Sequence, residues 1–130
     1  MAATLPSETS KRVLLVLFVP SSDREGNAIE GQSTWVDSAL ATLGRIFGGA
    51  TAYPKARGIW RDDERQGALV LDEPVVIHCY TTPKDVQDES NLQELGRFCR
   101  QMGRETNQGE VELVIGDEYL AIRNMDGEES

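Results

Sequence analysis

Two short apolar runs constrain the fold of this chain more than any other feature. "VLLVLFV" covers residues 13–19 and "VVIHCY" covers residues 75–80, and both have the length of a β-strand. Because apolar residues occupy consecutive positions, each strand presents apolar side chains on both of its faces, which is typical of the centre of a sheet. The chain is therefore expected to build one sheet around these two strands and to cover both faces of it.

Helices are predicted on either side of the second run. In residues 34–47 apolar side chains recur every three to four positions, with Thr34 as N-cap and Gly48 as terminator. A second helix starts either at Thr82, which is followed by proline, or at Ser90, which forms a capping box with Gln93. Gly103 is expected to end this helix, and each helix presents one apolar face to the sheet.

Three further segments have the composition of strands. These are residues 50–60, with Pro54 typical of an edge strand, residues 68–80, with a bend at Pro74, and residues 111–123, folded around a Gly116–Asp117 turn. The order β-α-β-β-α-β predicts an α+β, ferredoxin-like split β-α-β two-layer sandwich. The expected sheet order is 4-1-3-2, with an extra C-terminal strand. Residues 11–124 form one domain between a flexible N-terminal tail (1–10) and an acidic C-terminal tail (125–130).

Composition excludes several classes of function. The chain has 130 residues and a net charge of −9, which disfavours binding to nucleic acid and to anionic membranes. No run approaches the roughly 20 apolar residues of a membrane span. Two cysteines in apolar patterns are typical of reduced, buried thiols in a cytoplasmic protein.

The second face of the sheet indicates a partner. The helices cover one face only, yet the strand at residues 13–19 is apolar on both faces. Self-association is the simplest cover for the other face, so the expected partner is the chain itself, as a dimer or larger assembly, or else a larger protein.

No motif specifies a reaction. His78 is the only histidine, and its neighbour Cys79 points to the opposite face of the strand, so a zinc site is not expected. Phosphate-loop and dinucleotide glycine spacings are absent from the sequence, and no cofactor, metal or catalytic residue is predicted. The residues with binding potential are Trp60, Arg61, Glu73, His78, Tyr80, Asn107 and Gln108.

The stretch "RGIWRDDERQGALVLDE", residues 57–73, is predicted to be a hairpin whose solvated tip is "RDDERQ". Its register decides whether Trp60 and Glu73 meet. A turn centred between Gln66 and Gly67 sets Trp60 opposite Glu73, whereas a turn centred on Glu64 pairs Trp60 with Ala68.

These residues also resemble a family of small bacterial proteins of unknown function. The similarity runs from the "LF" of Leu17 through Trp35 to the G-x-W-R hairpin at Gly58, and then through Gly67 to Glu73. It ends near Tyr80, about half of the chain, and departs from the family pattern at "FGGATAYPKA". The resemblance implies a ferredoxin-like α+β fold and brings no established reaction.

The function predicted from these observations is that of a small, non-catalytic binding or accessory protein, acting by self-association or by docking on a larger partner. One alternative is a small enzyme or ligand sensor with a pocket lined by His78, Glu73, Trp60 and Tyr80. A second alternative is an acidic inhibitor of a basic protein, although the acidic residues gather in loops and not on one face.

Overall fold

A computed structural model describes residues 10–123. The predicted tails fall outside these residues, apart from Ser10. The elements are β1 (Val13–Val19), α1 (Gln32–Phe47), β2 (Thr51–Ala52), β3 (Gly58–Asp62), the 3₁₀ turn η2 (Asp63–Arg65), β4 (Ala68–Asp72), β5 (Val75–Thr81), α2 (Pro83–Gln87), α3 (Glu89–Glu105), β6 (Glu110–Ile115) and β7 (Glu118–Arg123). No helix among the described residues has both the length and the apolar character needed to cross a membrane.

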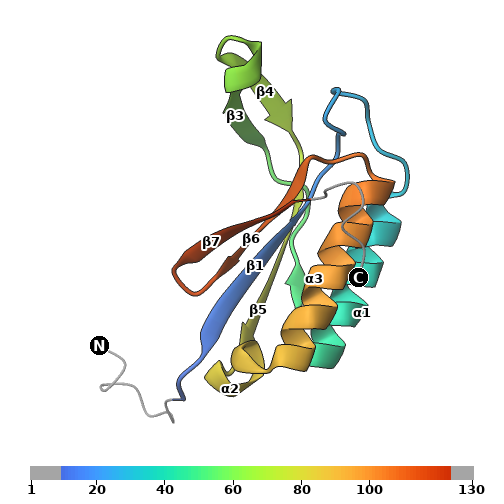
Figure 1. Cartoon of the computed structure of the whole chain (residues 1–130). Coiled ribbons are helices and arrows are strands. Elements are labelled where there is room, and N and C mark those ends of the chain that lie inside the picture. Colours follow the sequence, from blue (N-terminus) through green and yellow to red (C-terminus); the bar gives the residue numbers. More distant parts are fainter. Residues whose placement is uncertain (1–9, 124–130) are drawn as a thin grey trace.

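The main sheet has five strands in the order β2-β5-β1-β6-β7, and every neighbouring pair is antiparallel. Helices α1 and α3 lie on one face of this sheet (Figure 1). The predicted α+β architecture, with helices packed on a mostly antiparallel sheet, is confirmed. The two apolar runs become β5 and β1, which pair over their whole length from Val13 opposite Thr81 to Val19 opposite Val75.

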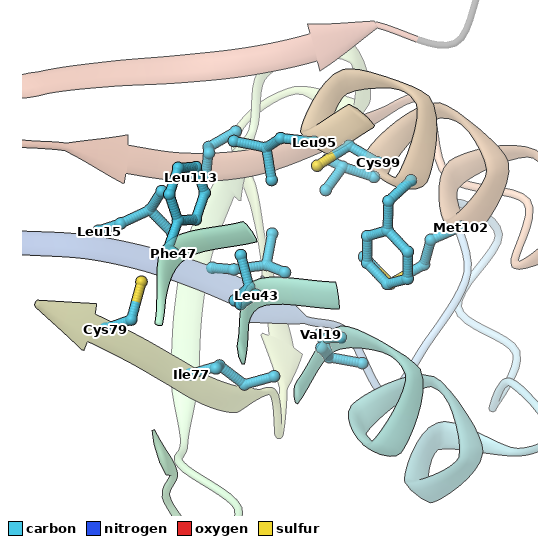
Figure 2. Close-up of a cluster of buried hydrophobic side chains, with 14 of the residues drawn as sticks. Leu15, Val19, Leu43, Phe47, Ile77, Cys79, Leu95, Cys99, Met102 and Leu113 are labelled. Carbon is cyan, nitrogen blue, oxygen red and sulfur yellow. The ribbon is translucent and has the colours of Figure 1, made fainter. Parts of the chain in front are cut away.

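The core lies between the sheet and the two long helices. Strand alternation points Leu15, Leu17 and Val19 towards the helices, where each is fully buried. Leu43 of α1 and Met102 of α3, also fully buried, pack onto the same layer (Figure 2). A row of alternate strand residues meeting helical residues at three-to-four spacing thus accounts for most of the buried apolar surface.

Two predicted strands are each broken into two, and this is a correction. Residues 50–60 form β2 and β3, and residues 68–80 form β4 and β5. Regular pairing of β2 ends before Pro54, because proline has no N–H to donate, although the N–H of Ala56 still donates to the carbonyl oxygen of Pro74 (2.8 Å). Pro74 marks the second break, as the sequence indicates. Strands β3 and β4 therefore form a separate two-stranded sheet, residues 58–72, which we call the arm. It projects beyond the end of the main sheet (Figure 1).

The helix ends also differ from the predictions. Helix α1 begins at Gln32, and its N-cap is Gly31 and not the predicted Thr34. Gly31 adopts a left-handed conformation (φ 75°). Gly48 ends it as predicted, with φ 97°. Asp88, and not Ser90, caps α3 by accepting a hydrogen bond from the N–H of Asn91 (3.1 Å). Helix α3 runs past the predicted end to Glu105, because a glycine inside a helix does not by itself interrupt the hydrogen bonds.

The face of the sheet opposite the helices carries apolar side chains, and we call it the open face. Leu14, Val16 and Phe18 of β1 point to it and are partly buried. Their neighbours across the strands include Tyr80, opposite Leu14, and Val114, opposite Val16. Within residues 10–123 the two long helices pack on the other side, so this face remains accessible.

Candidate functional site

Three aromatic side chains meet on the open face at the edge of the main sheet. Thr51 pairs with His78, so Tyr53, two residues further on, reaches the same face as His78. The hydroxyl of Tyr53 lies 3.2 Å from Nε2 of His78, and the two ring centres are 4.8 Å apart. Tyr80 stands beyond His78, with ring centres 5.5 Å apart. Both tyrosines remain exposed, by 46% and 59%, so the cluster offers ring surface to a ligand.

A shallow depression of about 430 Å³ adjoins this cluster. Strand β2 begins at Thr51, so β5 beyond His78 has no neighbour on that side, and Gly48 and Gly49 contribute no side chains to fill the space. The lining residues are Arg12, Phe47, Gly48, Gly49, Ala50, Thr51, His78, Cys79 and Tyr80. Aromatic residues therefore border a hollow that Arg12 also lines.

Trp60 and Arg61 lie elsewhere, on the arm. Trp60 pairs with Val70 and is 47% exposed, and its ring lies over Gly58, where a Cβ would come within 3.0 Å of it. The Nε of Arg61 donates to the Asp63 carboxylate (2.6 Å), and both side chains are about 70% exposed. An exposed pair of this kind contributes little to stability.

The hairpin turn is centred on Arg65, because Asp62 pairs with Ala68 and Gly58 pairs with Asp72. This register is neither of the two considered from the sequence. It leaves Glu73 outside the hairpin, one residue past the last pair, so Trp60 and Glu73 do not face each other. The tip itself is exposed as predicted, with the 3₁₀ turn η2 inside it.

The base of the arm is fixed by a buried carboxylate that sequence reasoning missed. Asp72 is only 7% exposed, and its Oδ1 accepts hydrogen bonds from the N–H (3.0 Å) and the hydroxyl of Ser21. The Ser21 oxygen in turn accepts from the N–H of Glu73 (3.0 Å). Glu73 thus lies at this anchor, whereas His78 is three strand positions beyond Val75, which alone spans roughly 10 Å. The structure does not bring Glu73 and His78 together.

Asn107 and Gln108 have structural partners. The amide of Gln108 donates to the carbonyl oxygen of Ser22 (2.8 Å), and the amide of Asn107 donates to the carboxylate of Glu25 (3.0 Å). Asn107 also accepts, through its carbonyl, from the N–H of Arg24 (3.0 Å). These hydrogen bonds connect the loop after β1 to the turn after α3. Asn107 and Gln108 therefore have a structural role between these two segments.

Of the seven predicted residues, the structure places only His78 and Tyr80 in one cluster. Tyr53 and Arg12 were missed. For Tyr53 a signal existed, since alternation along the predicted strand at residues 50–60 puts it on one face with Thr51, but the register against β5 was unknown.

A third tyrosine, Tyr119, lies on the other side of the open face. Tyr119 of β7 is 62% exposed and is hydrogen-bonded to the carboxylate of Glu112. Partial removal from water, together with Glu112 and the charge of Glu110, raises the pKa of Tyr119 to about 12. This hydroxyl therefore stays protonated at neutral pH. Within residues 10–123 no group of three or more histidine, cysteine, aspartate or glutamate side chains could hold a metal ion.

The fold defines a class of small α+β sandwiches, and solved structures that share it include two that cover 97% of this chain. One is a phage SAM lyase in complex with S-methyl-5′-thioadenosine, 18% identical, with a TM-score of 0.62, covering 97% of this chain and 100% of that chain. Another is a phage SAM lyase in the apo state, 15% identical, with a TM-score of 0.60 and the same coverage. No family model and no curated protein matches the sequence. The resemblance to small bacterial proteins stays a prediction.

These neighbours correct the predicted function. The sequence favoured a non-catalytic binding or accessory protein, whereas these two solved structures are of a lyase, which is an enzyme. The enzyme alternative is therefore the better supported one, although its pocket differs from the predicted pocket. His78 and Tyr80 belong to the cluster, while Trp60 and Glu73 lie on the arm and at its base.

Proposed function

We propose that this chain is an enzyme that cleaves S-adenosylmethionine and releases S-methyl-5′-thioadenosine. The observation that carries the proposal is the match in fold to the phage SAM lyase over 97% of this chain and 100% of that one. The aromatic cluster and its adjoining depression supply a place for the reaction that is compatible with this substrate.

Each part of S-adenosylmethionine has a matching group in the site. Adenine stacks on aromatic rings, and the exposed rings of Tyr53 and Tyr80 are available for that. The sulfonium is a cation, which aromatic faces also attract. Arg12 lines the depression and can hold the carboxylate of the methionine half. The substrate carries a net positive charge, so a chain with a net charge of −9 attracts it.

The chemistry requires cleavage of the bond between sulfur and Cγ of the methionine half. The carboxylate oxygen of the substrate attacks its own Cγ from the side opposite sulfur and closes a five-membered lactone. The electron pair of the broken bond returns to sulfur, which becomes the neutral thioether of S-methyl-5′-thioadenosine. No water, oxidant or protein base is consumed. In this route Arg12 positions the carboxylate of the substrate for attack on Cγ.

The direct test is to incubate the purified chain with S-adenosylmethionine and to separate the products by reversed-phase chromatography. S-methyl-5′-thioadenosine should form above a protein-free control, and mass spectrometry of the four-carbon product should detect the lactone or homoserine. An unsaturated amino acid would instead indicate elimination, with His78 as the base. Binding without turnover would favour the ligand-sensor reading, and neither binding nor turnover would refute the proposal.

Two matched pairs of variants test the site. Tyr80→Ala should raise KM about 5- to 150-fold, because the loss of stacking on a base costs roughly 1–3 kcal/mol, while Tyr80→Phe keeps the ring and should stay close to wild type. Arg12→Ala should lower kcat/KM, whereas the neighbouring Lys11→Ala, which does not line the depression, should not. Equal effects within both pairs would place the site elsewhere.

Two finer predictions go with this proposal. The four strands of the predicted core are proposed to have the ferredoxin-like order 4-1-3-2, with β6, β1, β5 and β2 as strands four, one, three and two. The order of these strands in the main sheet supports this proposal.

The cytoplasm is the proposed location, since the buried thiols of Cys79 and Cys99 are free and S-adenosylmethionine is an intracellular metabolite.

A further inference from the structure

Helix α3 separates its acidic side chains from its basic ones. Glu94 is paired with Arg45 of α1, and Glu105 accepts a hydrogen bond from the amide of Gln101 (3.0 Å). Positions 94, 101 and 105 recur at helical spacing, so these side chains lie along the flank of α3 that faces α1. The carboxylates of Glu94 and Glu105 are therefore held on that flank by neighbouring side chains.

The basic side chains of α3 lie on its outer side. Arg97, Arg100 and Arg104 are separated by three and four residues, which places them in one row about 10 Å long. We call these three residues the arginine row. The row is opposite Leu95 and Met102, which point into the core, and Arg97 and Arg104 are exposed. In a chain whose net charge is −9, the row is a local reversal of sign.

A shallow depression of about 460 Å³ adjoins the row on α3. Gly96 contributes no side chain to it, and the guanidinium of Arg100 lies beside this glycine, where a Cβ would come within 3.3 Å of Nη1. Leu92, which is 39% exposed, borders the depression one helical turn before Gly96, and Glu89 lies at its far end. The outer side of α3 thus combines an apolar contact with a row of cations.

We propose that the arginine row binds an acidic segment of another protein, with carboxylates on the row and one apolar side chain in the depression beside Leu92. Guanidinium groups bind carboxylates through paired hydrogen bonds, which favours this partner chemistry. A helix with glutamates three and four residues apart reproduces the spacing of the row. Glu89 repels carboxylates at the start of α3, so the acidic part of the partner lies towards Arg104.

Other anionic partners fit this surface less well. A nucleic acid or an anionic membrane presents negative charge over a wide area, which the acidic remainder of the chain repels. A protein segment can confine its carboxylates to the length of the row. A nucleic-acid backbone also offers no apolar side chain for the depression beside Leu92.

Fluorescence anisotropy with a labelled helical peptide of about 16 residues tests the proposal. The peptide carries one leucine followed by glutamates at the spacing of the row, and the control peptide has the same composition with its glutamates on different sides. Wild type should bind the first peptide more tightly. Arg97→Glu/Arg104→Glu should weaken binding about 10-fold, because two attractive contacts become repulsive.

Two matched controls separate the row from general effects of charge and volume. Arg57→Glu/Lys84→Glu changes the net charge by the same amount at exposed positions elsewhere and should bind like wild type. Gly96→Leu fills the depression and should weaken binding, whereas Gly44→Leu on α1, where a Cβ meets open space, should not. Circular dichroism shows that each variant is folded, and Arg97→Gln/Arg104→Gln replaces the charge reversal if that variant does not fold.

Four results would each overturn the proposal. These are no binding of the peptide, equal weakening by both double charge reversals, a short DNA duplex or phosphatidylserine vesicles bound at the row in place of the peptide, and peptide binding only after Asp126, Glu128 and Glu129 are changed to amides. In the last case acidic residues of the chain itself would compete for the row. Peptide affinity is measured without S-adenosylmethionine, so the outcome is independent of the proposed cleavage.

Discussion

Asp72→Ala should destabilise the protein by about 2–4 kcal/mol. The carboxylate is 7% exposed and accepts two hydrogen bonds from Ser21, one from the N–H at 3.0 Å and one from the hydroxyl. A hydrogen bond to a charged group contributes roughly 1.5–3 kcal/mol, and two of them give about 3–6 kcal/mol in total. Ser21 is only partly buried, so water recovers some of this loss, which gives the lower range.

Urea unfolding followed by circular dichroism measures the effect. With a urea m-value of about 2 kcal/mol/M, a loss of 3 kcal/mol lowers the midpoint by about 1.5 M. The matched control is Asp63→Ala, which removes a carboxylate that is 71% exposed and paired with Arg61, and it should cost no more than about 1 kcal/mol. If Asp72→Ala is as stable as the Asp63→Ala control, the hydrogen bonds at the base of the arm do not contribute measurably to the free energy of unfolding.

A double-mutant cycle separates the hydrogen bonds from other effects of the substitution. Ser21→Ala removes the same hydroxyl contact and also the bond that Ser21 accepts from the N–H of Glu73 (3.0 Å). If the two residues act through each other, the double variant should be more stable than the sum of the single losses predicts, by about 1 kcal/mol or more. If the stability losses of the two single variants simply add in the double variant, Asp72 and Ser21 do not act through each other, and the proposed anchor at the base of the arm is wrong.

Buried and constrained positions carry four further predictions. Leu43→Ala should cost about 2–5 kcal/mol in urea unfolding, because the side chain is fully buried in the core. Gly48→Ala should cost about 1–2 kcal/mol, since φ is 97°, whereas Gly49→Ala should be nearly neutral; in both cases a Cβ meets open space. Burial raises the pKa of Cys79 to about 11 and of Cys99 to about 12, so neither thiol should react with iodoacetamide at pH 8 until the protein is unfolded. Because these thiols ionise in the unfolded chain near about pH 8.5 and keep their protons when folded, stability should fall as the pH rises above about 9.

The central strands and the helices could be predicted from the sequence because local pattern determines them. Seven consecutive apolar residues at β1 indicate a central strand, and the three-to-four spacing of α1 indicates a helix with one apolar face. The β6–β7 hairpin was equally predictable from the sequence, since Gly116, at φ 64°, begins its turn and Ile115 pairs with Glu118. In each case the residues that decide the structure are neighbours in sequence.

The register of the arm and the site could not be predicted, because both depend on pairing between distant segments. Gln66 at φ 61° and Gly67 at φ 81° centre the hairpin on Arg65, and only glycine adopts such a conformation readily, so the position of Gln66 was not visible in the sequence. The aromatic cluster rests on a two-residue strand, where Thr51 pairs with His78. A shift of one position would send Tyr53 to the opposite face.

Net charge makes the proposed reaction sensitive to ionic strength. Acidic side chains give the chain a charge of −9, which attracts a cationic substrate. Salt screens this attraction over about 10 Å at 0.1 M, so the electrostatic attraction of the substrate should weaken as ionic strength rises.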